Sequence, residues 1–206
     1  MYRHFVKRLL DVVLSLAALI VLAVPMMIFA LMIKREDRGP ALFRQKRVGK
    51  GKRHFDMYKF RSMKMDTPHD VPTHLLADPE QYLLNCGKWM RKYSIDELPQ
   101  IINILKGDMS IVGPRPALWN QYDLIAERDK HGANDIRPGL TGWAQINGRD
   151  ELEIPEKAKY DGEYVLRESL MFDAMCIFRT VFSAARHEGV VEGGTGELSR
   201  KKSRSS

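Results

Sequence analysis

The sequence predicts a mixed α/β protein, in which a re-entrant N-terminal membrane helix hairpin precedes a small cytosolic domain of helices around a short sheet. Residues 12–33 form an uncharged, apolar run of 22 residues. Segments 41–47 and 53–61 have strand-like composition on either side of Gly49-Lys50-Gly51, which predicts a hairpin. Later segments carry apolar residues at helical spacing. We therefore divide the chain into 1–36, 37–190 and a tail, 191–206.

The composition narrows the class of protein. At 206 residues the chain can bury a core of its own. Its 33 Lys and Arg against 26 Asp and Glu give a net charge of +7, which predicts an anionic partner: nucleic acid, a membrane surface or a phosphorylated substrate. Cys86 and Cys176 lie far apart without a CxxC motif, so we expect reduced core cysteines.

The apolar run is long enough to cross a membrane, since 22 helical residues measure ~33 Å. It exceeds the apolar part of a signal peptide and lacks a cleavage site of small residues. A spanning helix and a re-entrant helix remain. Pro25 near the middle predicts a kink and a break in the membrane path. Asp11 lies one turn after Lys7 and Arg8, where it is placed to pair with either.

Basic residues on both flanks favour the re-entrant alternative, because the positive-inside rule then places both ends in the cytoplasm. These residues are Arg3, Lys7 and Arg8 before the run and Lys34, Arg35, Arg38, Arg44, Lys46 and Arg47 after it.

The predicted second strand ends in a basic pair. Alternation places Lys59 and Arg61 on one face, which is either an ordinary solvated face or two cations aimed at a phosphate. A helix is expected from Pro79 to about Lys92, with Asp78 as its cap and Arg91 near its end.

Ser94 and Glu97 have the spacing of a capping box, which places Asp96 and Glu97 in the first turn of a helix. The apolar stripe of that helix is expected in the core, which leaves the two carboxylates at an exposed tip. Free N–H groups and the positive end of the helix dipole favour anions there. By itself, such a pair is usually only a helix start.

Residues 108–112 have the pattern of a short strand and lead into Gly113-Pro114-Arg115-Pro116, where the two prolines restrict the backbone around Arg115. A helix is expected from about Ala117 to His131. The glycine-rich segment from Arg137 to Arg149 predicts either close backbone approach to a ligand or a string of tight turns.

The last third is predicted to be helical, from about Pro155 to Arg167 and again from Leu170. The second helix has an apolar face that fits either the core or a membrane surface, as an amphipathic interfacial helix. The tail, 191–206, is rich in Gly, Ser, Lys and Arg, so we expect disorder and contact with anionic lipids.

Taken together, these motifs resemble those of the bacterial sugar transferases, also called monotopic phosphoglycosyl transferases, in their small form. The resemblance extends from Lys7, Arg8 and Asp11 to Asp173. It is carried by Lys59-Phe60-Arg61-Ser62-Met63, Asp96-Glu97-Leu98-Pro99-Gln100, Lys106-Gly107-Asp108-Met109-Ser110, Gly113-Pro114-Arg115-Pro116 and the Arg137 to Arg149 segment.

The resemblance implies transfer of a sugar 1-phosphate from a UDP-sugar to undecaprenyl phosphate, a polyprenyl phosphate, with release of UMP. It also implies Mg²⁺, and a catalytic domain on the cytoplasmic face of the bacterial inner membrane, at the first membrane step of a glycoconjugate pathway. The family is thought to form a covalent phosphosugar intermediate on an aspartate, here Asp96, with Glu97 as its partner and both as metal ligands. A carboxylate is ionised at neutral pH and needs no separate base, while cations offset the charge of the diphosphate.

The same carry-over gives candidates for phosphate contacts, with Asp161 as a weaker polar candidate. They are Lys59, Arg61, Arg91, Arg115, Arg137, Arg149 and Asp161.

Two other classes of function compete with this reading. A nucleic-acid binder would fit the charge, but the sequence shows no aromatic stacking platform or recognition helix, so no nucleic acid is expected. The alternative is a non-catalytic, membrane-anchored basic binding protein.

Overall fold

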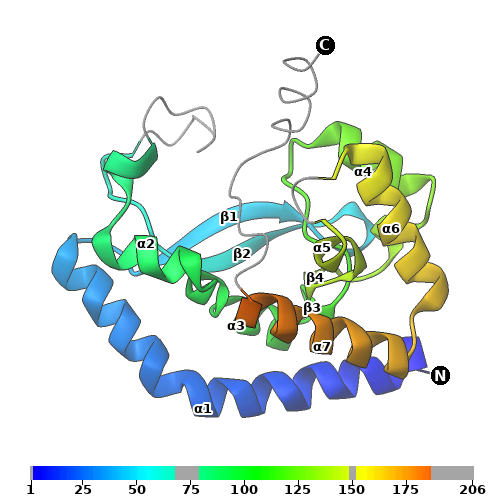
Figure 1. Cartoon of the computed structure of the whole chain (residues 1–206), viewed down its shortest axis with the longest axis horizontal. Coiled ribbons are helices and arrows are strands. Elements are labelled where there is room, and N and C mark those ends of the chain that lie inside the picture. The colour runs from blue at the N-terminus through cyan, green and yellow to red at the C-terminus, as the bar shows by residue number, and fades with distance from the viewer. Residues whose placement is uncertain (1, 68–78, 149–151, 187–206) are drawn as a thin grey trace.

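One long helix, α1 (Lys7–Glu36), runs along one side of the rest of the protein (Figure 1). The computed structural model describes residues 2–67, 79–148 and 152–186. Asp78, Arg149 and the tail, 191–206, lie outside these residues, as do the predictions made for them. A short π-helical turn, η1 (Tyr2–Val6), precedes α1.

The helix α1 is continuous through Pro25 and changes direction near its middle (Figure 1). A proline inside a helix removes one backbone hydrogen bond and bends the helix without ending it. The structure therefore shows one continuous helix that bends near its middle. Within the described residues it is the one helix long and apolar enough to cross a membrane, and 6% of its most apolar stretch is buried.

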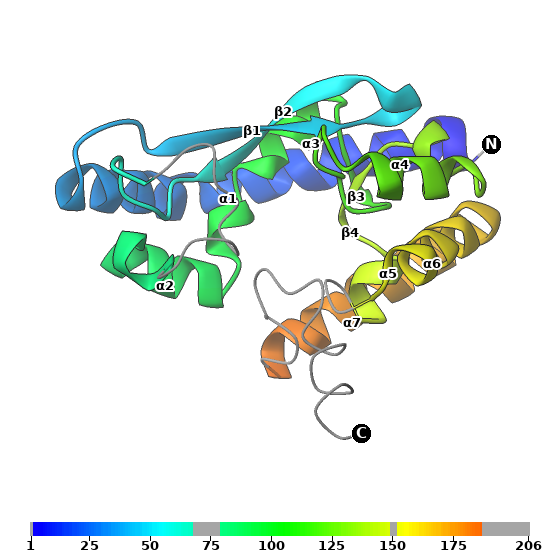
Figure 2. The ribbon, with the colours of Figure 1, turned by 90° about the horizontal axis from the view of Figure 1, so that it is seen from above.

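The predicted hairpin is confirmed. Strands β1 (Leu42–Val48) and β2 (His54–Phe60) pair antiparallel, from Leu42 opposite Phe60 to Val48 opposite His54. The turn η2 (Lys50–Lys52) joins them, and Gly51 there has a φ of 65°, a left-handed value that glycine adopts without strain. Seen from above, the hairpin runs in about the same direction as α1 (Figure 2).

A second, parallel sheet joins two short strands that are distant in sequence. It consists of β3 (Ser110–Val112), where a strand was expected, and β4 (Gly139–Thr141). Gly142 follows β4, and a Cβ atom there would lie 2.0 Å from the carbonyl oxygen of Gly113. Gly142 therefore allows its own backbone and that of Gly113 to approach closely.

The remaining helices pack around these sheets. They are η4 (Pro79–Tyr82), α2 (Asn85–Lys92), η5 (Ile95–Glu97), α3 (Gln100–Lys106), α4 (Tyr122–Asp129), η6 (Ala133–Asp135), α5 (Trp143–Ile146), α6 (Ile154–Arg167) and α7 (Leu170–Arg186). Figure 2 shows α2 near the C-terminal end of α1, with α6 nearer its N-terminal end.

Two predicted helices are shorter than expected because backbone groups in their predicted N-terminal parts bond to other segments. The N–H of Leu84 donates to the carbonyl of Ser62 at 3.0 Å, so α2 begins only at Asn85. The carbonyl of Ala117 accepts from the N–H of Val48 at 2.9 Å, so α4 begins only at Tyr122. The helices predicted from Pro155 and Leu170 are confirmed.

Both ends of α1 are attached to the same folded domain. At its C-terminal end, Ile33 is fully buried in an apolar cluster with Phe60, Leu84 and Met90. At the other end, Lys7 forms a buried ion pair with Asp173 of α7. The apolar residues between these two attachments are largely exposed on the outside of the protein.

Asp11 also belongs to the N-terminal attachment. Its carboxylate accepts hydrogen bonds from the hydroxyl of Ser110, at 3.1 Å, and from the N–H of Ile111, at 2.9 Å. The predicted pairing with Lys7 or Arg8 is therefore wrong: β3 lies close enough to satisfy this buried carboxylate instead. Cys86 and Cys176 are both free thiols, and Cys176 is buried in the core, as expected.

Candidate active site

Asp96 and Glu97 lie in η5, a tight turn between α2 and α3. The predicted capping box is wrong. An N-capping serine needs an extended backbone, whereas Ser94 is left-handed, with φ 54° and ψ 24°, and its side chain caps nothing. Its carbonyl accepts the N–H of Glu97 at 3.2 Å, which closes a 3₁₀ turn. The acidic pair therefore precedes α3.

The carboxylates are more recessed than expected. The side chain of Asp96 is 7% exposed and that of Glu97 is 12% exposed, so the predicted exposed tip is wrong. The strand β2 contacts η5 and brings Lys59 to both acids. The Lys59 ammonium lies 2.9 Å from Glu97 Oε1 and 3.9 Å from Asp96 Oδ2.

A second cation reaches the same oxygen from a distant segment. Arg115 Nη2 lies 3.1 Å from Glu97 Oε1. Lys59 and Arg115 therefore converge on one carboxylate oxygen, next to Asp96. Buried charges are stable only when paired in this way, and the pairing places two cations next to Asp96.

Two of the residues predicted to bind phosphate, Arg61 and Arg91, make polar contacts within the protein. Arg61 is buried and forms an ion pair with Asp37, while its Nε donates to the carbonyl of Pro40 at 2.8 Å. Arg61 therefore fixes the turn after α1. Arg91 Nε donates to the Ser62 hydroxyl at 2.8 Å, which ties the end of α2 to the segment that follows β2.

Arg137 lies at the end of α3 away from the acidic pair. Its Nε donates to the carbonyl of Gly107 at 2.9 Å. From α1, Arg8 donates to the carbonyls of Ile104 and Leu105, at 2.6 and 2.9 Å. Two guanidinium groups therefore meet the negative end of α3, where a helix favours cations.

Asp161 also pairs with a side chain of this protein. It is 1% exposed, and its Oδ2 accepts from Nε and Nη2 of Arg128 at 2.7 and 2.6 Å. Burial raises the pKa of Asp161, and the charges of Arg128 and Lys157 oppose that rise. The structure thus brings Lys59 and Arg115 to the acidic pair and engages Arg61, Arg137 and Asp161 elsewhere.

Sequence reasoning missed a buried polar cluster around Tyr164. The Tyr164 hydroxyl donates to Asp173 at 2.7 Å and accepts from the Lys7 ammonium at 3.0 Å, and Tyr2 also donates to Asp173, at 2.6 Å. Asp173 follows Phe172 on the apolar face of α7, and an acid on such a face is a signal that could have been read. Burial and Asp173 raise the pKa of Tyr164 strongly, so it stays a neutral donor.

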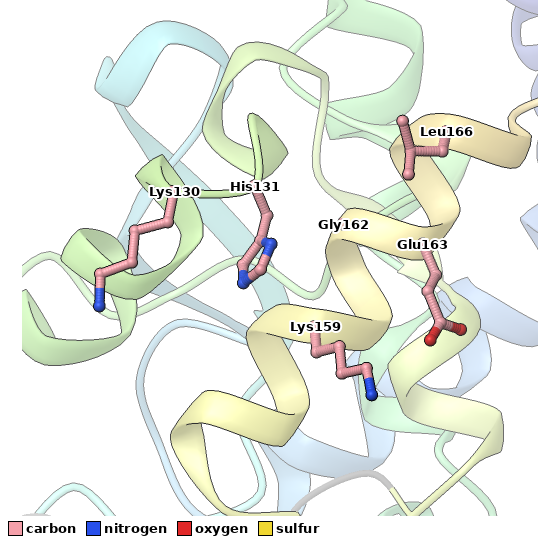
Figure 3. A pocket seen from close by; sticks show the side chains of 6 residues that line it. All are labelled: Lys130, His131, Lys159, Gly162, Glu163 and Leu166. Carbon is pink, nitrogen blue, oxygen red and sulfur yellow. The ribbon is translucent and has the colours of Figure 1, made fainter.

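A hollow of about 350 Å³ lies at the surface between the end of α4 and α6 (Figure 3). None of the predicted site residues lines it. It is lined by Lys130, His131, Lys159, Gly162, Glu163 and Leu166.

The described residues contain no group of three or more His, Cys, Asp or Glu side chains that could hold a metal ion. The acidic pair supplies two adjacent carboxylates. That donor set fits Mg²⁺, which commonly takes one or two carboxylates and completes its octahedron with substrate phosphates and water.

Comparison with known protein families identifies the family of this chain. The family model described as bacterial sugar transferase matches residues 2–187. The chain belongs to this family. The resemblance of its motifs is thereby confirmed, and the match covers both the acidic pair and the helix α1.

Three relatives are named as sugar transferases or sugar phosphotransferases. The chain is 40% identical over 191 residues to the UDP-glucose:undecaprenyl-phosphate glucose-1-phosphate transferase of Escherichia coli, covering 87% of this chain and 40% of that protein. It is 38% identical to the undecaprenyl-phosphate glucose phosphotransferase of Komagataeibacter xylinus, covering 85% of this chain and 35% of the relative. The uncharacterized sugar transferase EpsL of Bacillus subtilis is 37% identical, with 89% of each chain covered.

Proposed function

We propose that the protein is a phosphoglycosyl transferase, which moves a sugar 1-phosphate from a UDP-sugar to undecaprenyl phosphate and releases UMP. The family match and the names of the relatives support this reaction class. The observation that carries it is the site itself: Asp96 lies beside a Glu97 oxygen that Lys59 and Arg115 share.

In the proposed reaction, an Asp96 carboxylate oxygen attacks the phosphorus that carries the sugar. The bond from that phosphorus to the bridging oxygen breaks, and UMP leaves with the electron pair. A phosphate oxygen of undecaprenyl phosphate then attacks the same phosphorus and releases the Asp96 carboxylate. Neither nucleophile requires a base, because both are anions at neutral pH.

Lys59 and Arg115 have a direct part in this scheme. The attacking carboxylate and the diphosphate are both negative, so their approach is repulsive without nearby cations. The two side chains are held beside the acidic pair before substrate arrives, so they supply positive charge without rearrangement. Asp96 and Glu97 are the residues that would hold Mg²⁺, which when bound would offset charge on the diphosphate.

We also propose a membrane placement. Both ends of α1 contact one domain, so a bilayer crossing would need that domain on both faces of the membrane; a helix that enters and returns does not. On α7, exposed apolar side chains would lie in the interface with anionic lipids, on the cytoplasmic face. They are Leu170, Met171, Phe178, Val181 and Phe182.

Labelling of single cysteines introduced at positions 2 and 40 tests the re-entrant geometry. When the thiol reagent is confined to the cytoplasm, the cysteines at both positions should be labelled. Periplasmic access at position 2 would mean that α1 spans the bilayer.

The reaction is tested by UMP release from purified protein in detergent with undecaprenyl phosphate, Mg²⁺ and a panel of UDP-sugars. Asp96→Asn should lower turnover by about 10³-fold or more, because it removes the nucleophile. Asp56→Asn, the same change at an exposed acid on β2, should leave turnover unchanged. Without acceptor, wild-type protein should gain the mass of one phosphosugar and release one UMP.

Two results would contradict the proposal. Wild-type turnover in Asp96→Asn would exclude Asp96 as nucleophile. No UMP release by the wild-type protein with any donor would favour the non-catalytic, membrane-anchored basic binding protein.

A further inference from the structure

Carbonyl groups hold the backbone of the segment that carries Arg115 at four successive positions. Pro114 and Pro116 have no N–H to donate, so at these two residues a backbone hydrogen bond can reach only the carbonyl oxygen. The carbonyl of Pro114 accepts the N–H of Gly139 at 2.9 Å. The carbonyl of Pro116 accepts Arg47 Nη1 at 2.9 Å, and that of Ala117 accepts the N–H of Val48 at 2.9 Å.

The carbonyl of Arg115 itself accepts from a buried side chain. It accepts Nη1 of Arg128 at 3.0 Å. Four successive carbonyls, from 114 to 117, are therefore held from β4, α4 and β1. At positions 115 and 116 the donors are charged guanidinium groups, of Arg128 and Arg47, and a hydrogen bond from a charged group is about twice as strong as one between neutral groups.

Arg128 is in turn fixed by Asp161. Its Nε and Nη2 both point to Asp161 Oδ2, at 2.7 and 2.6 Å, which leaves Nη1 directed at the Arg115 carbonyl. Arg128 is 3% exposed and Asp161 is 1% exposed, so neither charge is satisfied by water. The guanidinium is planar, so fixing two of its nitrogens also fixes the third.

The two helices that carry this pair approach each other closely. On α6, Gly162 follows Asp161, and a Cβ atom there would lie 2.7 Å from Cβ of His131. Figure 3 shows the His131 ring directed toward α6 across this position. A larger residue would push the end of α4 from α6, so the sequence here keeps Arg128 within reach of Asp161.

We propose that Arg128 and Asp161 are positioning residues for the transfer reaction: their buried ion pair holds the backbone of Arg115, so that the Arg115 guanidinium meets Glu97 beside Asp96. The inference rests on the proposed function only for its kinetic consequence. It gives Asp161 a role through Arg115, whereas the resemblance implied only a weaker polar candidate for the substrate site.

The test replaces the pair as a unit, with Arg128→Met and Asp161→Leu together. Removing one partner leaves a buried charge and risks unfolding, whereas replacing both with apolar residues of similar size is often neutral for stability. We expect a folded protein whose kcat falls by about 10- to 100-fold, because a small misplacement of a charged group is enough for such a loss. Asp129→Asn, at an exposed acid next to Arg128 on α4, is the matched control and should retain wild-type kcat.

A second comparison separates positioning from general damage. In an Arg115→Ala background the double replacement should lower kcat little further, because the group that it positions is already gone. Hydrogen exchange followed by mass spectrometry should show faster exchange in the peptide 113–118, with α4 and α6 as protected as in the wild type.

Several outcomes would overturn the inference. They are a kcat within twofold of wild type in the folded double variant, a full additional loss in the Arg115→Ala background, or unchanged exchange at 113–118. The exchange measurement needs no substrate. It therefore remains decisive even if the protein releases no UMP, which would contradict the proposed function alone.

Discussion

The two ends of α1 are attached to the same domain by different physical means. At the N-terminal end the contacts are polar and buried: Lys7 pairs with Asp173, and Asp11 accepts from the segment around Ser110. At the C-terminal end the main contact is apolar, with Ile33 fully buried against its cluster. Polar networks fix the geometry of the groups they join, whereas apolar clusters tolerate small shifts. We therefore expect the N-terminal contacts to set the orientation of α1 on the domain and the C-terminal contact to add stability.

The largest effect is expected from Lys7→Met, which leaves the Asp173 carboxylate buried without its cation. Breaking a buried ion pair from one side costs about 4 kcal/mol of unfolding free energy. Denaturant unfolding in detergent measures it. Lys52→Met is the control, because Lys52 forms an exposed pair with Asp129, and such pairs contribute about 0–1 kcal/mol. Equal losses in the two variants would contradict the contrast.

A smaller loss is expected at the apolar end. Ile33→Ala removes side-chain volume from a fully buried position and should cost about 3 kcal/mol through lost burial and a residual cavity. The same unfolding measurement applies. Ile20→Ala, on the same helix at a position that is 70% exposed, should change the unfolding free energy far less. If both cost the same, the C-terminal attachment does not depend on the cluster.

The smallest effect concerns Asp37, just after α1. The hydrogen bond from Arg61 holds the pKa of Asp37 below its ordinary value of 3.8. A carboxyl with a lowered folded pKa stabilises the protein above pH 3.8 and loses that contribution as the pH falls through the folded value. The difference in stability between wild type and Asp37→Asn should therefore shrink below pH 3.8. A difference that is constant with pH would show that the charge of Asp37 is irrelevant.

Short sequence patterns correctly predicted much of the secondary structure. Strand alternation around Gly51 gave the hairpin, and apolar periodicity gave α6 and α7, because neighbouring residues alone decide those features. Ser94 shows where this fails. Ser94 and Glu97 have the spacing of a capping box, but Glu97 accepts a hydrogen bond from Lys59, a strand residue distant in sequence, and the left-handed backbone of Ser94 does not fit an N-cap.

The candidate site divides in the same way. Lys59 and Arg115 were found because their motifs are local and match the family. The roles of Arg61 and Asp161 depend on partners 24 and 33 residues away, Asp37 and Arg128, and no short pattern encodes such contacts. Arg128 itself lies on a helix without any marked motif, so only the tertiary structure shows that it faces Asp161.

The double attachment of α1 also limits how the chain can change during evolution. One residue inserted between Lys7 and Ile33 would rotate everything beyond it by about 100° and turn Ile33 out of its cluster. The domain fixes the distance between the two attachments of α1, so the helix cannot be adapted to bilayers of different thickness by lengthening it one residue at a time. Adaptation to a new lipid environment is left to side-chain exchange along its outer surface.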